Sequence, residues 1–213
     1  MRLLDLYCGV GGATKGYQEV GFTVTGVDIR PQKHYCGDAF VLGDALAYLM
    51  AHGGEYDAIH ASPPCQAYSK MRALPNGKDK DHPDLVAATR DLLVASGRPY
   101  VIENVPKSPV RGSLLLCGSM FGLKSDRGYL MRHRWFETSF LVMSPGPCRH
   151  EGVAVGVYGH GSAGHLGQRM RTANVDEARL LMAMPWAPRD GLAQAIPPPY
   201  TAWIGGFLRA FLA

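Results

Sequence analysis

The sequence contains no uncharged apolar run close to the roughly 18 residues that a membrane span requires. The N-terminal stretch reaches an aspartate at position 5, so it does not resemble a secretory signal. Cysteine is scarce: there are 5, widely scattered, with no CxxC pair and no common zinc spacing. We therefore expect a cytoplasmic protein with free thiols and no disulfide framework, structural metal or membrane contact.

Neither charge sign dominates the chain. Its 213 residues carry 22 Lys and Arg against 18 Asp and Glu, a net charge of +4, which permits a polyanionic partner without requiring one. Hydrophobic residues make up 46%, enough for one folded domain with a core of its own. No internal repeat is visible.

Short apolar runs alternate with helical segments over the first hundred residues, which is typical of an α/β sheet domain. We predict strands over residues 2–7, 22–27, 40–42, 56–61, 100–105, 114–116 and 134–140. We predict helices over residues 12–20, 45–51, 83–95, 174–182 and 200–212, with Asn174 as the N-cap of the fourth. Residues 141–170 are rich in glycine, with proline near their start, and predict an irregular insert rather than a second folded core.

A glycine-rich turn follows the first predicted strand and reads Asp5-Leu6-Tyr7-Cys8-Gly9-Val10-Gly11-Gly12. Glycines allow a tight turn and close approach to a ligand, in the crevice where open α/β sheets bind cofactors. Taken alone, these glycines could serve only to let the backbone turn from a strand into a helix. Acidic residues at the ends of the next two strands, Asp28 and Asp44, favour a nucleoside cofactor, with Asp28 suited to ribose hydroxyls.

The fourth predicted strand runs into Ser62-Pro63-Pro64-Cys65-Gln66-Ala67-Tyr68-Ser69. Two prolines fix φ and stiffen the backbone just before Cys65, so that its thiol would project from the active edge of the sheet. A buried, unreactive cysteine is the alternative, and it is what we expect of Cys8, Cys36 and Cys117. The polar, basic loop that follows Cys65 argues for the reactive thiol.

Two further motifs carry charge. Glu103-Asn104-Val105 ends the fifth predicted strand, and a buried carboxyl there can donate as well as accept a proton. Arg132-His133-Arg134 enters a later strand, and its two arginines point the same way if the segment is extended. Alternatively, the glutamate is a capping or salt-bridging residue and the arginines an exposed basic edge.

In this order the motifs resemble those of the DNA cytosine-5 methyltransferases, over residues 5–12, 62–69, 103–105, 132–134, 174–185 and 195–205. The resemblance implies a Rossmann-like mixed sheet flanked by helices, with S-adenosyl-L-methionine as cofactor and duplex DNA containing the target cytosine as partner. It also implies an enzyme that acts as a monomer. Such an enzyme would work in a bacterial or phage-infected cell, for example in restriction-modification.

The resemblance also implies a role for each matching residue. Cys65 would attack cytosine C6, Glu103 would hydrogen-bond N3 and the exocyclic amine, Arg134 would hold O2, and Arg132 would support the loop around the thiol. The implied DNA contacts are Pro64, Gln66, Ser69 and Asn104. The implied cofactor contacts are Asp5, Tyr7, Cys8, Gly9, Gly11, Gly12, Asp28, Ile29, Asp44, Ala45 and Pro63.

Three features depart from the family pattern. Leu130 replaces a glutamine before the arginine pair, Gln194 replaces an asparagine, and the target-recognition region shrinks to residues 139–170. The catalytic domain would then comprise residues 1–138 and 171–213. An insert this small has few side chains that could contact bases, and each base pair that is read contributes about 1–3 kcal/mol of discrimination. We therefore expect a recognition sequence of about two to four base pairs, or nearly non-specific action.

Two alternatives remain open. The same fold could act on RNA or a free pyrimidine nucleotide, or use another one-carbon donor. The second alternative is a DNA-binding or regulatory homologue without catalytic activity. The presence of both Cys65 and Glu103 argues against it. His150, His160 and His165 with Cys148 match no standard metal spacing, so we expect no metal ligands among them.

Overall fold

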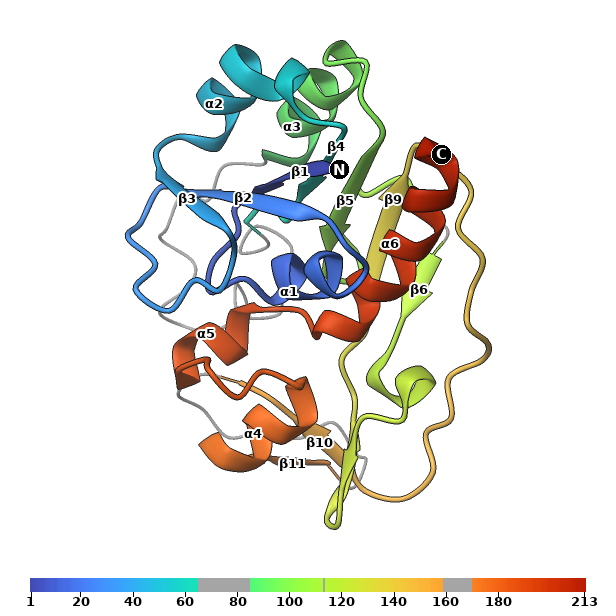
Figure 1. The fold of residues 1–213 in the computed structure, drawn as a ribbon. Helices are drawn as coiled ribbons and strands as arrows, with labels where there is room; N and C mark the ends of the chain where they lie inside the picture. Colours follow the sequence, from blue (N-terminus) through green and yellow to red (C-terminus); the bar gives the residue numbers. More distant parts are fainter. Residues whose placement is uncertain (65–84, 113, 159–169) are drawn as a thin grey trace.

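The computed structural model describes residues 1–64, 85–112, 114–158 and 170–213. Its main layer is a 7-stranded sheet of order β3-β2-β1-β4-β5-β9-β6 (Figure 1). The strands are β1 (Arg2–Leu6), β2 (Thr23–Asp28), β3 (Ala39–Leu42), β4 (Ala58–Ala61), β5 (Tyr100–Asn104), β6 (Leu114–Leu116) and β9 (Arg134–Thr138). Strands β1 to β5 pair in parallel, whereas β9 runs antiparallel to both β5 and β6. The predicted α/β class and mixed, Rossmann-like sheet are confirmed.

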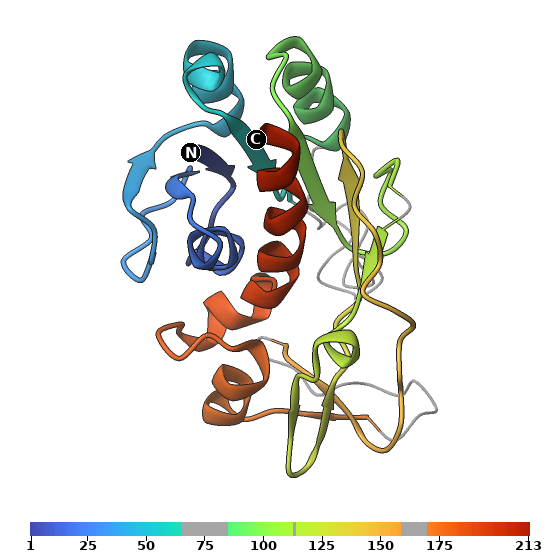
Figure 2. The same cartoon turned by 45° about the vertical axis from the view of Figure 1, so that its right-hand side comes forward.

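Helices cover both faces of this sheet, because side chains alternate between the faces along each strand. Leu3 packs with α1 (Gly12–Glu19) and α6 (Pro198–Leu212) on one face. Leu4 packs with α2 (Ala45–His52) and α3 (Leu85–Ala95) on the other. Figure 2 shows α1 and α6 lying side by side against the sheet.

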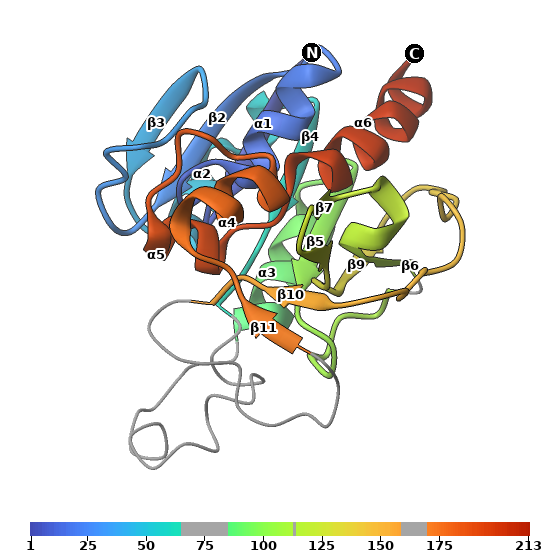
Figure 3. The same cartoon turned by 90° about the horizontal axis from the view of Figure 1, so that it is seen from below.

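A second, smaller sheet, of order β11-β10-β8-β7, lies below the first in the view of Figure 1, and Figure 3 shows it from beneath. It has a core of its own, which contains the fully buried Leu130, Val155 and Leu181. Its elements are β7 (Lys124–Ser125), β8 (Gly128–Leu130), β10 (Ala154–Gly156) and β11 (Met170–Thr172), covered by α4 (Val175–Met182) and α5 (Arg189–Gln194). We call this unit the small subdomain.

The prediction of an irregular insert without a folded core is therefore wrong at residues 154–156. Strand β10 has only 3 residues and lies among glycines, so its apolar signal is too short to stand out. Leu130, which departs from the family pattern, is part of the small subdomain's core. The small sheet takes strands from both sides of the predicted boundary between residues 138 and 139.

Most predicted elements appear with shifted ends. The strand predicted over residues 56–61 begins at Ala58, and the one predicted over residues 134–140 ends at Thr138. Asn174 caps α4 as predicted, since its side chain accepts a hydrogen bond of 2.9 Å from the Glu177 backbone N–H. No helix in the described part of the chain is both long and apolar enough to cross a membrane.

The contact between α1 and α6 gives a test of the packing. Gly16 faces α6 so closely that an added methyl group would collide with the Pro198 carbonyl and the Thr201 hydroxyl. Gly16→Ala should therefore lower the free energy of unfolding by about 1–3 kcal/mol, measured by urea denaturation.

Gly206→Ala is the matched control, because Gly206 lies in α6 but faces open space. That change should raise the free energy of unfolding by up to about 1 kcal/mol, since alanine is the better helix former. Equal stability of the two variants would contradict the described helix contact.

Candidate active site at the carboxyl edge of the sheet

Most of the predicted site residues that the structure describes lie at one edge of the main sheet. The carboxyl ends of β1 to β5 all lie there, because these strands are parallel. The first residue of β9 reaches the same edge because β9 runs antiparallel to β5. This is the edge at which open α/β sheets bind ligands.

The turn after β1 follows a left-handed path. Tyr7, Gly9 and Gly11 have φ values of 60°, 51° and 87°. The Gly9 amide donates a 3.0 Å hydrogen bond to an Asp28 carboxylate oxygen, which ties the turn to the end of β2. A side chain at Gly9 would meet nothing within 4 Å, so space is open beside this backbone. The turn is thus rigid and accessible, as a cofactor cradle requires.

The other turn residues are fixed by packing. A methyl group at Gly12 would collide with the Ile196 carbonyl, so glycine there permits close contact with the segment before α6. The Cys36 thiol donates a 3.2 Å hydrogen bond to the Gly11 carbonyl. Cys8 is buried, and burial raises the pKa of its thiol, which disfavours the reactive thiolate.

Asp5 lies beneath the turn with no exposed surface. One carboxyl oxygen accepts a 2.5 Å hydrogen bond from the Thr14 hydroxyl. The other, Oδ1, is buried and has no hydrogen-bond partner among the described residues. Burial raises the pKa of Asp5 to about 7. A buried polar atom without a partner is costly, so Oδ1 is suited to a ligand group that donates a hydrogen bond.

The two acids near the ends of β2 and β3 already have protein partners. Besides Gly9, Asp28 accepts a 2.9 Å hydrogen bond from the Arg30 amide. Asp44 is the N-cap of α2 and accepts from the Ala47 amide at 2.8 Å, while Ala45 behind it is buried. Ile29 is 71% exposed, an apolar surface next to Asp28.

A buried ion pair joins the ends of β5 and β9. The Arg134 Nε lies 3.0 Å from the Glu103 Oε1, and the two side chains are 15% and 9% exposed. Burial raises the pKa of Glu103, although the charge of Arg134 and a hydrogen bond with Ser62 oppose the rise. A raised pKa favours the protonated form of this glutamate, the form that can donate a proton to a bound base.

A buried hydrogen-bond chain leads to this glutamate from inside the sheet. The Tyr17 hydroxyl lies 3.0 Å from His60 Nδ1, and His60 Nε2 lies 3.0 Å from the Ser62 hydroxyl. Burial lowers the pKa of His60 to about 3, so the imidazole is neutral. Sequence reasoning missed His60, although a histidine between apolar residues of a buried strand is a recognisable signal.

The ends of β4 and β5 are tied directly to each other. The Asn104 side-chain amide donates a 2.9 Å hydrogen bond to the Pro63 carbonyl, and its oxygen accepts from the Val105 amide at 2.8 Å. Asn104 is 1% exposed, so it orients the Pro63-Pro64 segment; its predicted contact with DNA stays a prediction. Cys65, Gln66 and Ser69 lie outside the described residues.

Arg132 is buried between the main sheet and the small subdomain. Its guanidinium donates to the Val157 and Ala193 carbonyls at 3.1 and 2.8 Å, while its Nε has no partner among the described residues. Burial and the charge of Arg134 lower its pKa to about 9. The Tyr200 hydroxyl donates to the Arg132 carbonyl at 2.7 Å. These contacts anchor the segment that precedes Arg134 to the small subdomain and to α6.

Comparison with solved structures relates this architecture to known enzymes. The chain is similar to the S. pombe Dnmt2 methyltransferase, with 14% identity, 99% coverage of each chain and a TM-score of 0.64. A putative DNA modification methyltransferase from an E. coli prophage is 21% identical over 64% of this chain and 45% of its own, with a TM-score of 0.43. No family model and no curated protein matches. The chain therefore shares its Rossmann-like fold with the S. pombe Dnmt2 methyltransferase.

Asp5 provides a pH test of the site. Because burial raises its pKa from 3.8 to about 7, the folded protein prefers the protonated carboxyl. The stabilisation that this carboxyl contributes is complete below pH 3.8 and is lost as the pH rises towards 7. Asp5→Asn should remove this loss of unfolding free energy with rising pH. The loss amounts to up to about 4 kcal/mol, at 1.36 kcal/mol for each unit of difference between the folded and unfolded pKa.

The measurement is urea unfolding of ligand-free protein at several pH values from acidic to neutral. Asp57→Asn, which changes an exposed aspartate, serves as control and should give a curve parallel to that of the wild type. If Asp5→Asn also ran parallel to the wild type, the carboxyl would not be protonated on folding.

Proposed function

We propose that this protein is a DNA (cytosine-5)-methyltransferase that uses S-adenosyl-L-methionine. The observation that carries the proposal is the buried Glu103–Arg134 pair, which lies at the same sheet edge as the Pro63-Pro64 segment leading to Cys65. A carboxyl and a guanidinium together match the N3, amine and O2 edge of cytosine.

The β1 edge fits the cofactor. S-adenosylmethionine supplies an electrophilic methyl group on a sulfonium. Asp5 Oδ1, buried and unpartnered among the described residues, would accept a hydrogen bond from its ammonium group. Asp28 would accept from the ribose hydroxyls with the lone pairs that its two backbone contacts leave free, and the exposed Ile29 would contact the adenine. The remaining cofactor contacts that we propose are Tyr7, Cys8, Gly9, Gly11, Gly12, Asp44, Ala45 and Pro63.

Cys65 would act as the nucleophile. Its thiolate would add to C6 of the cytosine, and the electron pair of the C5–C6 double bond would make C5 nucleophilic. C5 would then take up the methyl group as the bond from that group to the sulfonium sulfur breaks, which leaves S-adenosylhomocysteine. Loss of the C5 proton then restores the double bond and expels the thiolate. Cysteine is only a few per cent ionised at neutral pH, so nearby positive charge must favour the thiolate.

Glu103 would lower the barrier to this addition. Negative charge develops on the ring when the thiolate adds, and a proton or hydrogen bond at N3 stabilises it. A raised pKa favours the protonated Glu103 that would supply this proton, while Arg134, which contacts the Glu103 carboxyl group, would donate a hydrogen bond to O2. Arg132 would keep Arg134 in place through its contacts with the small subdomain.

The cytosine must leave the duplex to reach this buried pair, at a cost of a few kcal/mol. We propose that Pro64, Gln66, Ser69 and Asn104 contact the flipped base or its strand, and that residues 139–170 read the flanking bases. The recognition sequence would then be as short as the sequence analysis predicts.

The direct test is incubation with methyl-labelled S-adenosylmethionine and four competing acceptors: duplex DNA, single-stranded DNA, RNA and dCMP. Label should appear at C5 of cytosine in duplex DNA, and a random-sequence duplex read base by base should show its sequence context. Transfer to RNA or to the nucleotide alone would instead favour the alternatives given above. Cofactor binding without transfer to any acceptor would favour the catalytically silent homologue.

A substitution of Glu103 tests the proposed proton donation. Glu103→Gln keeps the shape of the side chain but removes its proton, so kcat for methyl transfer should fall by about 10²–10⁴-fold with cofactor affinity unchanged. Glu19→Gln, at the exposed end of α1, is the matched control and should keep full activity. Full transfer by Glu103→Gln would refute the proposed role of Glu103.

A further inference from the structure

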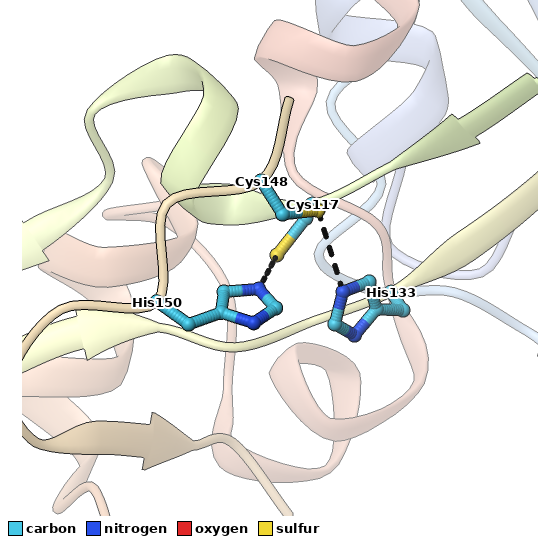
Figure 4. Close-up of side chains that lie close together, drawn as sticks. All are labelled: Cys117, His133, Cys148 and His150. Atoms are coloured by element: carbon cyan, nitrogen blue, oxygen red, sulfur yellow. Dashed lines mark hydrogen bonds between the residues drawn. The ribbon is translucent and has the colours of Figure 1, made fainter. Parts of the chain in front are cut away.

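Two cysteines and two histidines converge outside the candidate active site. They are Cys117, His133, Cys148 and His150, and their ligand atoms all lie within 4.8 Å of one another. Figure 4 shows the two thiols and the two imidazoles pointing toward one another. The proposed function uses none of these side chains.

The four residues come from three separate places in the chain. Cys117 follows β6 and precedes the short 3-10 helix η4 (Gly118–Phe121). His133 lies immediately before β9, and Cys148 and His150 lie between β9 and β10, in a stretch that forms neither helix nor strand. The spacing along the sequence therefore matches no standard zinc motif, although the folded chain brings the side chains together.

The distances suit a tetrahedral metal ion. Cys117 Sγ lies 3.4 Å from His150 Nε2, and Cys148 Sγ lies 3.5 Å from His133 Nε2. A tetrahedron with Zn–S bonds of about 2.3 Å and Zn–N bonds of about 2.05 Å has sulfur-to-nitrogen edges of about 3.6 Å. These two contacts are within about 0.2 Å of such edges, and the remaining pairs of ligand atoms lie within 4.8 Å of one another, so small side-chain shifts would complete the tetrahedron.

We propose that Cys117, His133, Cys148 and His150 form a structural Zn²⁺ site. The protein supplies two thiolates and two imidazoles, a complete tetrahedral set, so no position remains for water or substrate and the site is structural rather than catalytic. The soft sulfur ligands select zinc over magnesium or calcium, which prefer oxygen.

The surroundings hold the ligands in place. The Ser119 hydroxyl donates a 3.5 Å hydrogen bond to Cys117 Sγ and accepts one of 3.2 Å from the Arg149 amide. The Tyr129 ring stacks on His150, with centroids 5.6 Å apart and planes 6° from parallel. Such outer contacts fix the orientation of metal ligands.

Through His133, the proposed zinc site is connected to the Glu103–Arg134 pair. His133 lies between Arg132 and Arg134, and its carbonyl accepts a 2.8 Å hydrogen bond from Arg134. A zinc ion would hold the backbone on which the Glu103–Arg134 pair depends. It would also attach residues 141–153, a described stretch that forms neither helix nor strand, to the main sheet.

The first experiment is metal analysis of the wild-type protein, expressed in zinc-supplemented medium and purified without chelator. We expect one zinc per chain. After exchange, cobalt should give the visible d–d bands of a tetrahedral site together with thiolate-to-cobalt charge-transfer absorption. Both readouts are independent of substrate, so they decide the metal site even if the proposed function is wrong.

Variants then test the ligands. Cys148→Ser and His150→Gln should each reduce zinc to well below one per chain and alter the cobalt spectrum. Cys36→Ser and His34→Gln, outside the cluster, should keep one zinc per chain. If the ligand variants do not fold, the wild-type cobalt spectrum and a drop in Tm on chelation decide the matter. Wild-type protein without zinc or a tetrahedral cobalt spectrum, or with a Cys117–Cys148 disulfide, would overturn the proposal.

Discussion

The ion pair between Glu103 and Arg134 is the interaction on which the candidate site depends. It exists because β9 enters the sheet antiparallel to β5, which brings the start of β9 to the edge where the parallel strands end. Burial alone would favour the neutral carboxylic acid, whereas the guanidinium and Ser62 favour the charged form. The net result is a raised pKa of Glu103, which favours the protonated form that the proposed methyl transfer would use.

The neighbouring contacts keep that pair in one arrangement. Asn104 ties the end of β5 to the Pro63-Pro64 segment, and Arg132 ties the start of β9 to the small subdomain. Breaking a buried pair of this kind is costly because it leaves an uncompensated charge, so the supporting contacts also contribute to stability. The site thus lies where the main sheet meets the small subdomain, and the proposed zinc ion would reinforce the same junction.

The sequence predicted the main sheet well, because buried parallel strands are short apolar runs separated by polar turns. It also placed Asp5, Asp28 and Glu103 at one edge, since that follows from strand direction alone. It missed strand β10 and the hairpin of β7 and β8, which are too short to give a periodic signal. Pairings across the fold were equally hidden: local sequence does not show that Asn104 binds Pro63, or that Cys117 meets His150.

The central claim is that Cys65 bonds to the same cytosine that Glu103 holds. A duplex containing 5-fluorocytosine tests it, because fluorine at C5 cannot leave as a proton does and the enzyme stays attached to the DNA. With S-adenosylmethionine present, the wild type should give a covalent complex that survives denaturing electrophoresis, and Cys65→Ala should give none. A complex of equal yield with Cys65→Ala, or none with a wild type that still methylates DNA, would contradict the account.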